Sequence, residues 1–247
     1  MATRIFQKTR QGSERGERLF GRGIYAGILM PAVVLVGLSA ASIFSADTAA
    51  DRLHRAQKLL WEGGDLQESH ALFSSVLEDW PASPHAAEAH AGLGLLMEKQ
   101  QSADSLLVAE AFRSAALLDP EAEEAGRWWM RAGEHFQRAN QSDDAEYAYT
   151  QCIVTYPSCA DTALIAVANL HLVDGTLDLA LEYYQKATEA SDPATARLAR
   201  MGVSVTYEHL GDLDSALAEL DEDEDASKER RLRLFQRQRD RGLSRDK

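Results

Sequence analysis

Residues 126–159 read GRWWMRAGEHFQRANQSDDAEYAYTQCIVTYPSC, and this stretch decides the fold. Small and aromatic residues recur in it at spacings of three and four, in two groups: Trp129, Gly133 and Phe136, then Ala145, Tyr149 and Cys152. Residues at these spacings share one helix face, so the stretch predicts two helices with one packing stripe each. Asn140 and Ser142 favour a turn between the helices, and Pro157 ends the second one.

The same arrangement recurs along the chain, and four prolines 36 to 39 residues apart mark its period: Pro81, Pro120, Pro157 and Pro193. A fixed period in this range indicates a solenoid, in which each unit buries its apolar face only by stacking on its neighbours. Four units follow the pattern, at about 50–83, 87–122, 126–159 and 161–194. A fifth begins near residue 197 and departs from it, with Leu220 where an aromatic is usual and Asp223 where a small residue is usual.

This pattern resembles the tetratricopeptide repeat, a helix–turn–helix unit of about 34 residues. The resemblance implies an all-α solenoid of about five repeats over residues 50–225, and it implies that the protein binds other proteins. An unrelated helical bundle is the alternative fold. The large residues of the pattern, such as Trp129, Phe136, Tyr149 and Tyr184, are then expected in the core.

Residues 24–44 read IYAGILMPAVVLVGLSAASIF, an uncharged run long enough to cross a bilayer. Residues 1–23 hold six Lys or Arg, which predicts a cytoplasmic N-terminus and repeats on the far side of the membrane, the periplasm in a bacterium. A cleaved signal peptide is the rival interpretation, and a eukaryotic organelle receptor with cytosolic repeats is another. Two small-residue pairs are candidates for packing against a second transmembrane helix, although such residues are common in membrane spans: Gly23 with Gly27, and Gly37 with Ala41.

Charge is distributed unevenly beyond this segment. Residues 45–225 hold 34 acidic and 11 basic residues, which argues against binding of nucleic acid or anionic lipid by the repeats. Residues 226–247 hold nine basic and three acidic residues, with Leu232, Leu234 and Phe235 as a short apolar patch. We expect a capping helix or a partly disordered extension here. Docking on an acidic partner, on the acidic repeats or on a membrane surface are the functional alternatives.

The family resemblance implies that the first helix of each unit lines a concave groove. Carried over position by position, the expected lining is His54, Lys58, Trp61, Glu88, Leu95, Glu98, Arg127, Met130, Glu134, Arg138, Thr162, Ile165, Asn169, Leu172, Leu198, Met201 and Val205. Its later part is apolar, which favours contact with a helix or an extended segment of a partner. Some family members clamp a partner's C-terminal carboxylate. Asn169 matches one clamp position, but Ile165 replaces a required cation, which argues against that mode.

No catalytic motif is found: there is no HExxH, no P-loop and no glycine-rich dinucleotide fingerprint. The sequence therefore predicts no enzyme, no cofactor, no metal site and no small-molecule substrate.

Cys152 and Cys159 are the only cysteines. They either form a disulfide after a fold-back of the chain at Pro157, or remain a buried thiol and a turn thiol.

Together these features predict a single-pass inner-membrane protein with a periplasmic repeat domain. Its predicted work is that of a non-catalytic scaffold, an accessory subunit of an integral-membrane complex. A periplasmic chaperone-like factor that catches unfolded or exported clients is the alternative.

Overall fold

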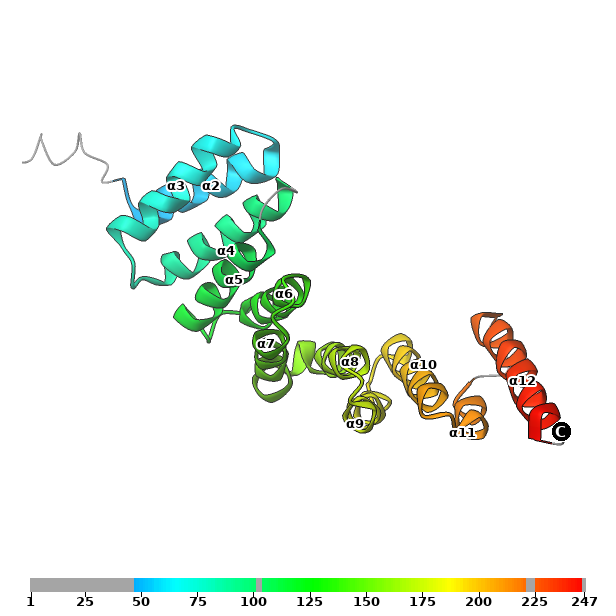
Figure 1. The fold of residues 1–247 in the computed structure, drawn as a ribbon. Coiled ribbons are helices and arrows are strands. Elements are labelled where there is room, and N and C mark those ends of the chain that lie inside the picture. The colour runs from blue at the N-terminus through cyan, green and yellow to red at the C-terminus, as the bar shows by residue number, and fades with distance from the viewer. Residues whose placement is uncertain (1–46, 101–103, 221–224, 246–247) are drawn as a thin grey trace, which may run out of the picture. The chain divides into compact units, whose positions relative to one another are not determined.

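The computed structural model describes residues 47–100, 104–220 and 225–245, and these contain eleven helices and no strand (Figure 1). The predicted all-α class is confirmed for this part of the chain. In chain order the helices are α2 (Ala49–Glu62), α3 (Leu66–Asp79), α4 (Pro84–Lys99), α5 (Ser105–Leu118), α6 (Ala125–Arg138), α7 (Ser142–Thr155), α8 (Pro157–Val173), α9 (Leu177–Ala187), α10 (Pro193–Leu210), α11 (Leu213–Ala218) and α12 (Asp225–Arg245).

The predicted membrane segment 24–44, with Gly23, Gly27, Gly37 and Ala41, lies outside the described residues. Within them, no helix combines the length and the apolar character that a bilayer crossing requires.

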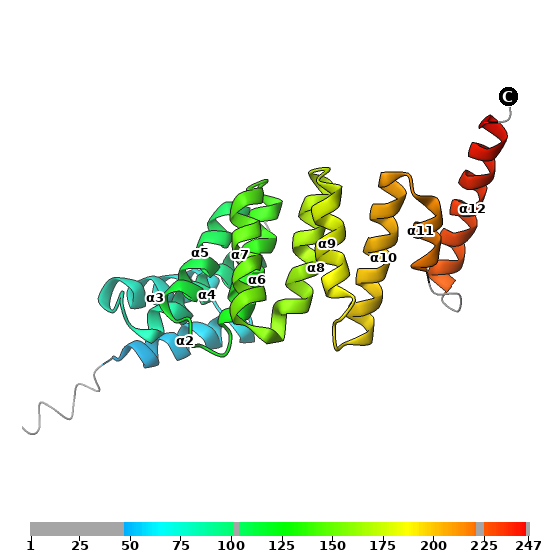
Figure 2. The same ribbon diagram turned by 90° about the horizontal axis from the view of Figure 1, so that it is seen from below.

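The helices pack in consecutive pairs, as a solenoid requires. In each pair the first helix packs on the second: α2 on α3, α4 on α5, α6 on α7, α8 on α9 and α10 on α11 (Figures 1 and 2). The second helix of a pair also contacts the first helix of the next pair, so every unit covers its neighbour's apolar face. This arrangement confirms the predicted stack of helix pairs.

Local sequence sets where the helices begin. Asp65, Ser83 and Asp192 each accept a hydrogen bond from a backbone amide of the following first turn. The sequence predicts that Pro157 ends a helix, and in the structure Pro157 also begins the next one. The helix before it ends at Thr155, and Pro157 is itself the first residue of α8. At this position an N–H group would have no partner within the helix, so the N–H that proline lacks costs no hydrogen bond. Unit four therefore starts four residues earlier than the predicted 161.

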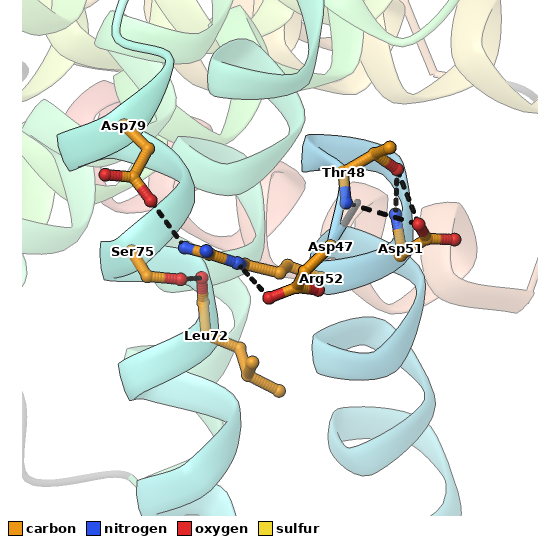
Figure 3. Close-up of polar contacts among 7 residues, drawn as sticks. All are labelled: Asp47, Thr48, Asp51, Arg52, Leu72, Ser75 and Asp79. Carbon is orange, nitrogen blue, oxygen red and sulfur yellow. Dashed lines mark hydrogen bonds and ion pairs between the residues drawn. The ribbon is translucent and has the colours of Figure 1, made fainter. Parts of the chain in front are cut away.

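At the N-terminal end of the described solenoid, Arg52 links α2 to Asp47 and to the end of α3 (Figure 3). Arg52 on α2 donates from Nε to Asp47 at 2.7 Å and from Nη1 to Asp79, at the end of α3, also at 2.7 Å. Its guanidinium lies 5.0 Å from the centre of the Trp80 ring. Thr48 caps α2, and its hydroxyl and amide lower the pKa of Asp51 by hydrogen bonding. The first helix is thus held to the second at the edge of the domain.

Four aromatic rings of the core each lie directly against a glycine of a neighbouring helix. A Cβ atom added at Gly133 would stand 2.4 Å from the ring of Tyr149, and one at Gly202 would stand 2.3 Å from the ring of Tyr184. The other pairs of this kind are Gly94 with Phe112 and Gly92 with Phe73. The residues expected in the core, namely Trp129, Phe136, Tyr149 and Tyr184, are buried. Glycine is needed because the backbone of one helix lies directly against the ring of another.

The C-terminal end of the solenoid is covered by α12. Leu234 is 1% exposed and completes a cluster with Leu213, Ala216 and Leu220. The expected patch of three residues is therefore divided: Leu234 is buried, whereas Leu232 and Phe235 are 60% and 49% exposed. Leu220, which departs from the repeat pattern, is 5% exposed and packs in the same cluster as Leu234.

Candidate protein-binding groove

Three adjacent cavities lie on one surface formed by α2, α4 and α6, which we call the α2–α4–α6 groove. They are continuous, because one cavity shares Leu60, Trp61 and Leu95 with the next, and that one shares Glu98 and Arg131 with the third. Side chains of α4 and α6, such as Glu98 and Arg131, meet across the space between the two helices.

One end of the groove is apolar with an acidic rim. This cavity of about 270 Å³ is lined by Gln57, Leu60, Trp61, Glu88, Ala91, Gly92, Leu95, Glu124 and Trp128. Trp61 stands in the last turn of α2 and is 69% exposed, whereas Trp128 is 8% exposed. Gln57 donates a hydrogen bond of 3.2 Å to Glu88. An exposed tryptophan above an apolar floor can hold an apolar side chain, and the carboxylates can attract a cation beside it.

The other end is larger and carries charges of both signs. This cavity of about 600 Å³ includes Glu98, Arg131, Glu134, His135 and Arg138 in its lining. Glu98 of α4 pairs with Arg131 of α6, and the Nε2 atom of His135 lies 2.8 Å from its second oxygen. These pairs bridge the two helices across the gap. They also leave donors and acceptors at the wall that a bound backbone could use.

The rings behind this network hold it in place. His135 is buried and stacks on Phe112, with ring centres 6.3 Å apart. The guanidinium of Arg131 lies 5.5 Å from the centre of the same Phe112 ring. Lys99 donates to the carbonyl oxygen of Leu60 at 2.7 Å, which ties the end of α2 to α4. The charged end of the groove is therefore built on core residues.

Six of the residues predicted from the sequence line these cavities: Trp61, Glu88, Leu95, Glu98, Glu134 and Arg138. His54 and Lys58 are exposed on α2, where Lys58 lies 3.9 Å from Glu62. Arg127 is exposed, and Met130 packs against the central core. That any of these residues binds a partner stays a prediction.

Of the predicted α6 residues, Glu134 and Arg138 line the cavities, but the sequence reasoning did not include Trp128 and Arg131, nor Glu124 directly before the helix. Glu124, Trp128 and Arg131 follow at spacings of four and three, one residue away from the predicted Arg127 and Met130. The resemblance to a repeat fixes which helix lines the groove, but a shift of one residue turns the lining by about 100°.

Predicted groove residues in the later units are placed differently. Ile165 and Leu172 pack against the cluster of Ala168, Ala180, Tyr184 and Val203. Asn169 is exposed, and its side-chain oxygen accepts a hydrogen bond from the Tyr184 hydroxyl. Thr162 and Leu198 are exposed, whereas Met201 and Val205 are half-buried. That these later residues, Asn169 included, bind a partner stays a prediction.

The two cysteines are free thiols. Cys152 is buried and donates to the carbonyl oxygen of Gly126 at 3.3 Å, and Cys159 donates to that of Tyr156 at 3.4 Å. Burial raises the pKa of both thiols, so they are poor nucleophiles. Among the described residues, no group of three or more His, Cys, Asp and Glu side chains is arranged to hold a metal ion.

The sequence profile of the tetratricopeptide repeat matches residues 58–105, 130–195 and 168–229. The chain belongs to the tetratricopeptide repeat family. Proteins of this family typically mediate protein–protein interactions without catalysis, so the coarse prediction of a protein-binding scaffold agrees with the family. A comparison with curated proteins found no match.

Solved structures share the tetratricopeptide repeat fold. The crystal structure of MamA protein has a TM-score of 0.58 and 18% identity, over 70% of this chain and 88% of that one. YrrB, a TPR protein with an unusual peptide-binding site, has a TM-score of 0.56 and 20% identity, over 73% and 91%. BtubC (BKLC) from P. vanneervenii has a TM-score of 0.54 and 14% identity, over 83% and 88%. Identities this low concern the fold alone.

Proposed function

We propose that this protein is a non-catalytic scaffold that holds a segment of a partner protein in the α2–α4–α6 groove. The observation that carries the proposal is Trp61, 69% exposed at the mouth of a cavity floored by Leu60, Leu95 and Trp128. Exposing a tryptophan beside other apolar side chains is unfavourable in water, and a partner's side chain placed there would remove that surface from solvent.

The lining suggests the chemistry of the bound segment. Of the two cavities that Trp61 lines, the one with Glu88 and Glu124 suits an apolar residue with a lysine or arginine nearby. The other is lined by Glu98, Lys99 and Arg131. The charged end offers Arg131, Glu134 and Arg138 as hydrogen-bonding groups for the rest of the segment. The peptide-binding site of YrrB, a protein of the same fold, supports a peptide as the ligand.

The proposed setting is a bacterial inner membrane. Residues 24–44 would anchor the chain, residues 1–23 would lie in the cytoplasm and the repeats would lie in the periplasm, beside an integral-membrane complex. The uncharged run and the six basic residues before it support this setting. In this role the anchor keeps the groove close to its partner and so raises the effective concentration of both.

Copurification of the full-length protein in mild detergent, followed by crosslinking and mass spectrometry, tests the proposal. We expect one complex at fixed stoichiometry, with crosslinks near Trp61 and Arg131. Trp61→Ala should weaken binding at least tenfold, because truncation of a central aromatic anchor typically costs about 2 kcal/mol or more.

Leu117→Ala is the matched control, since Leu117 is 59% exposed on α5 and lines none of the three groove cavities. It should bind as the natural chain does. Equal binding by both variants would place the contact elsewhere on the protein.

The alternative is a chaperone-like factor for exported clients. Val173 and Leu198, 81% and 60% exposed on α8 and α10, are apolar side chains outside the α2–α4–α6 groove that such clients would contact. The same crosslinking separates the two functions: many substoichiometric clients crosslinked near these residues would support the chaperone and contradict the scaffold.

A further inference from the structure

The outward face of α12 carries two apolar side chains between two cations. Lys228, Leu232, Phe235 and Arg239 follow at spacings of four, three and four, so they share one side of the helix. All four are exposed, Leu232 by 60% and Phe235 by 49%. We call these four residues the α12 stripe. Neighbouring apolar side chains that face water on one helix face indicate a surface for contact with another molecule.

The opposite side of α12 holds this helix to the solenoid. Leu234 is buried in the cluster of α11 residues, and Arg230 and Arg237 pair with Glu208 of α10. At about 100° per residue, Leu234 lies roughly 100–160° around the helix from the stripe residues. The contacts that fix α12 therefore turn the α12 stripe away from the repeats of its own chain.

The α4 wall of the α2–α4–α6 groove carries the matching pattern. Glu88, Gly92, Leu95 and Glu98 line its cavities at spacings of four, three and three. A carboxylate thus stands at each end of this wall, and an apolar stretch lies between the two. Trp61, which shares both of these cavities with Leu95, adds an exposed aromatic ring beside that stretch.

The two patterns agree in order and in length. With a rise of about 1.5 Å per residue, Lys228 and Arg239 are about 16 Å apart along α12, and Glu88 and Glu98 are about 15 Å apart along α4. A helix laid along α4 therefore brings its two cations to the two carboxylates and its apolar pair to the apolar stretch. Glu98 is shared with other side chains of the groove, so we assign the main attraction to Glu88.

The overall charge of the chain favours the same contact. Residues 45–225 hold 34 acidic and 11 basic residues, whereas residues 226–247 hold nine basic and three acidic ones. Whole repeat domains repel one another, but the basic end of one chain is attracted to the acidic repeats of another. Complementary charge of this kind selects the partner and orients it more than it adds affinity.

We propose that the α12 stripe of one copy of this chain docks in the α2–α4–α6 groove of a second copy, with Leu232 and Phe235 beside Trp61. The groove must belong to a second copy, because α2 and α12 lie at opposite ends of the stack of helices (Figures 1 and 2). Docking removes the exposed apolar side chains of both surfaces from water, and an aromatic pair at the centre supplies most of the affinity.

The contact is head-to-tail, so each copy keeps an unused groove at one end and an unused α12 stripe at the other. Such contacts build rings where the rotation closes and open chains where it does not. The contact rests on the role in protein binding proposed above for the groove, and it names one ligand of that groove. A segment of another partner would then compete with α12 for the same place.

Photocrosslinking of the full-length chain in mild detergent tests the contact. Light chains carry a photoreactive benzoylphenylalanine in place of Phe235 and are mixed with heavy-isotope chains of natural sequence. We expect crosslinked peptides that join α12 of a light chain to the region of Trp61 and Leu95 in a heavy chain. The same photoreactive group in place of Leu117, which is exposed on α5, is the control and should give no crosslink there.

Two variants of equal charge test the α12 stripe itself, with self-association measured by sedimentation in the same detergent. Arg239→Gln should weaken self-association about threefold, because it removes a cation from the rim of the contact. Arg233→Gln removes the same charge from the cavity on the other side of α12 and should leave self-association unchanged. Phe235→Ala should weaken it at least about tenfold. Circular dichroism should show all three variants equally helical.

The variants also separate this contact from the binding of another partner. Trp61→Ala should weaken both, whereas Phe235→Ala should weaken self-association alone. If Trp61→Ala weakens only the binding of the other partner, the contact between copies is overturned and the proposed scaffold stands. If Trp61→Ala weakens only self-association, the contact between copies stands and the groove is not the site of the other partner.

Two further results would overturn the contact. Equal effects of Arg239→Gln and Arg233→Gln would mean that diffuse attraction, and not the α12 stripe, brings the copies together. Crosslinks that join α12 of a light chain to α12 of a heavy chain, with none near Trp61, would replace the head-to-tail contact by a symmetric one.

Discussion

At the scale of a residue, Gly133 shows how closely the helices of a unit approach. Its hydrogen atom occupies the place of a Cβ that would lie 2.4 Å from the Tyr149 ring. We expect Gly133→Ala to lower the free energy of unfolding by about 1–2 kcal/mol, although alanine favours a helix, because overpacking a core outweighs that gain. Urea unfolding of residues 47–247, which form one compact unit, measures the change.

A double-mutant cycle identifies the cause. In a Tyr149→Leu background, Gly133→Ala should cost less than in the natural chain, because the smaller side chain leaves room for the added methyl group. Additive costs would show that the ring is not what opposes a side chain at position 133.

The buried thiols predict a dependence of stability on pH. Burial raises the pKa of Cys152 in the folded state, so above the ordinary thiol pKa of about 8.5 the unfolded chain loses this proton first. Stability should therefore be constant for this group below pH 8 and fall as pH rises from about 8.5 to 10. The contribution is up to about 1.4 kcal/mol per pH unit.

Urea midpoints measured between pH 7 and 10 test this dependence. Cys152→Ala should flatten the decline even though it lowers stability at pH 7, and Cys159→Ala should flatten it less because Cys159 is only half-buried. A decline of unchanged slope in Cys152→Ala would assign the effect to other groups, such as Tyr149, whose pKa burial also raises.

At the scale of an element, α12 is joined to the solenoid by one buried apolar side chain, Leu234, and by the pairs of Arg230 and Arg237 with Glu208 of α10. Leu234→Ala should cost about 2–5 kcal/mol locally, because it empties a buried position, whereas Leu232→Ala should change stability little. Hydrogen exchange should show faster exchange in α11 and α12 for the first variant only. Protection of α2 to α7 should be unchanged, because repeats are stabilised by their neighbours. Equal exchange in both variants would mean that α12 is held by its arginines alone.

How far the sequence predicts each element depends on what determines it. The helix pairs follow from two stripes at spacings of three and four, Trp129 to Phe136 on α6 and Ala145 to Cys152 on α7, because such spacings place residues on one helix face. The first residue of α8 was missed because Pro157 can both end one helix and begin another. On α6 the predicted Glu134 and Arg138 line the cavities, whereas Arg127 and Met130 were named in place of their neighbours Trp128 and Arg131. The rotation of a helix about its axis is set by contacts with α4 and not by local pattern. That Leu234 is buried while Leu232 is exposed likewise depends on where α12 contacts α10 and α11.

At the scale of the whole molecule, the acidic surface should make stability depend on salt. Residues 45–225 carry 34 acidic and 11 basic residues, and like charges oppose the compact state. Raising NaCl from 20 to 200 mM shortens the Debye length from roughly 20 Å to below 10 Å. We expect the urea midpoint of residues 47–247 to rise. A fall would show that ion pairs such as Arg52 with Asp47 outweigh the repulsion.

The buried residues form separate clusters in series, and this has a mechanical consequence. The central cluster, around Trp129 and Tyr149, joins nineteen buried residues, whereas the last one, around Leu220 and Leu234, joins four. When a chain is pulled from its two ends, every cluster in series bears the same force. The last cluster should yield first and the central one late. A protein held at one end and loaded at the other would then lengthen stepwise, as a tether with a weak link at its C-terminus.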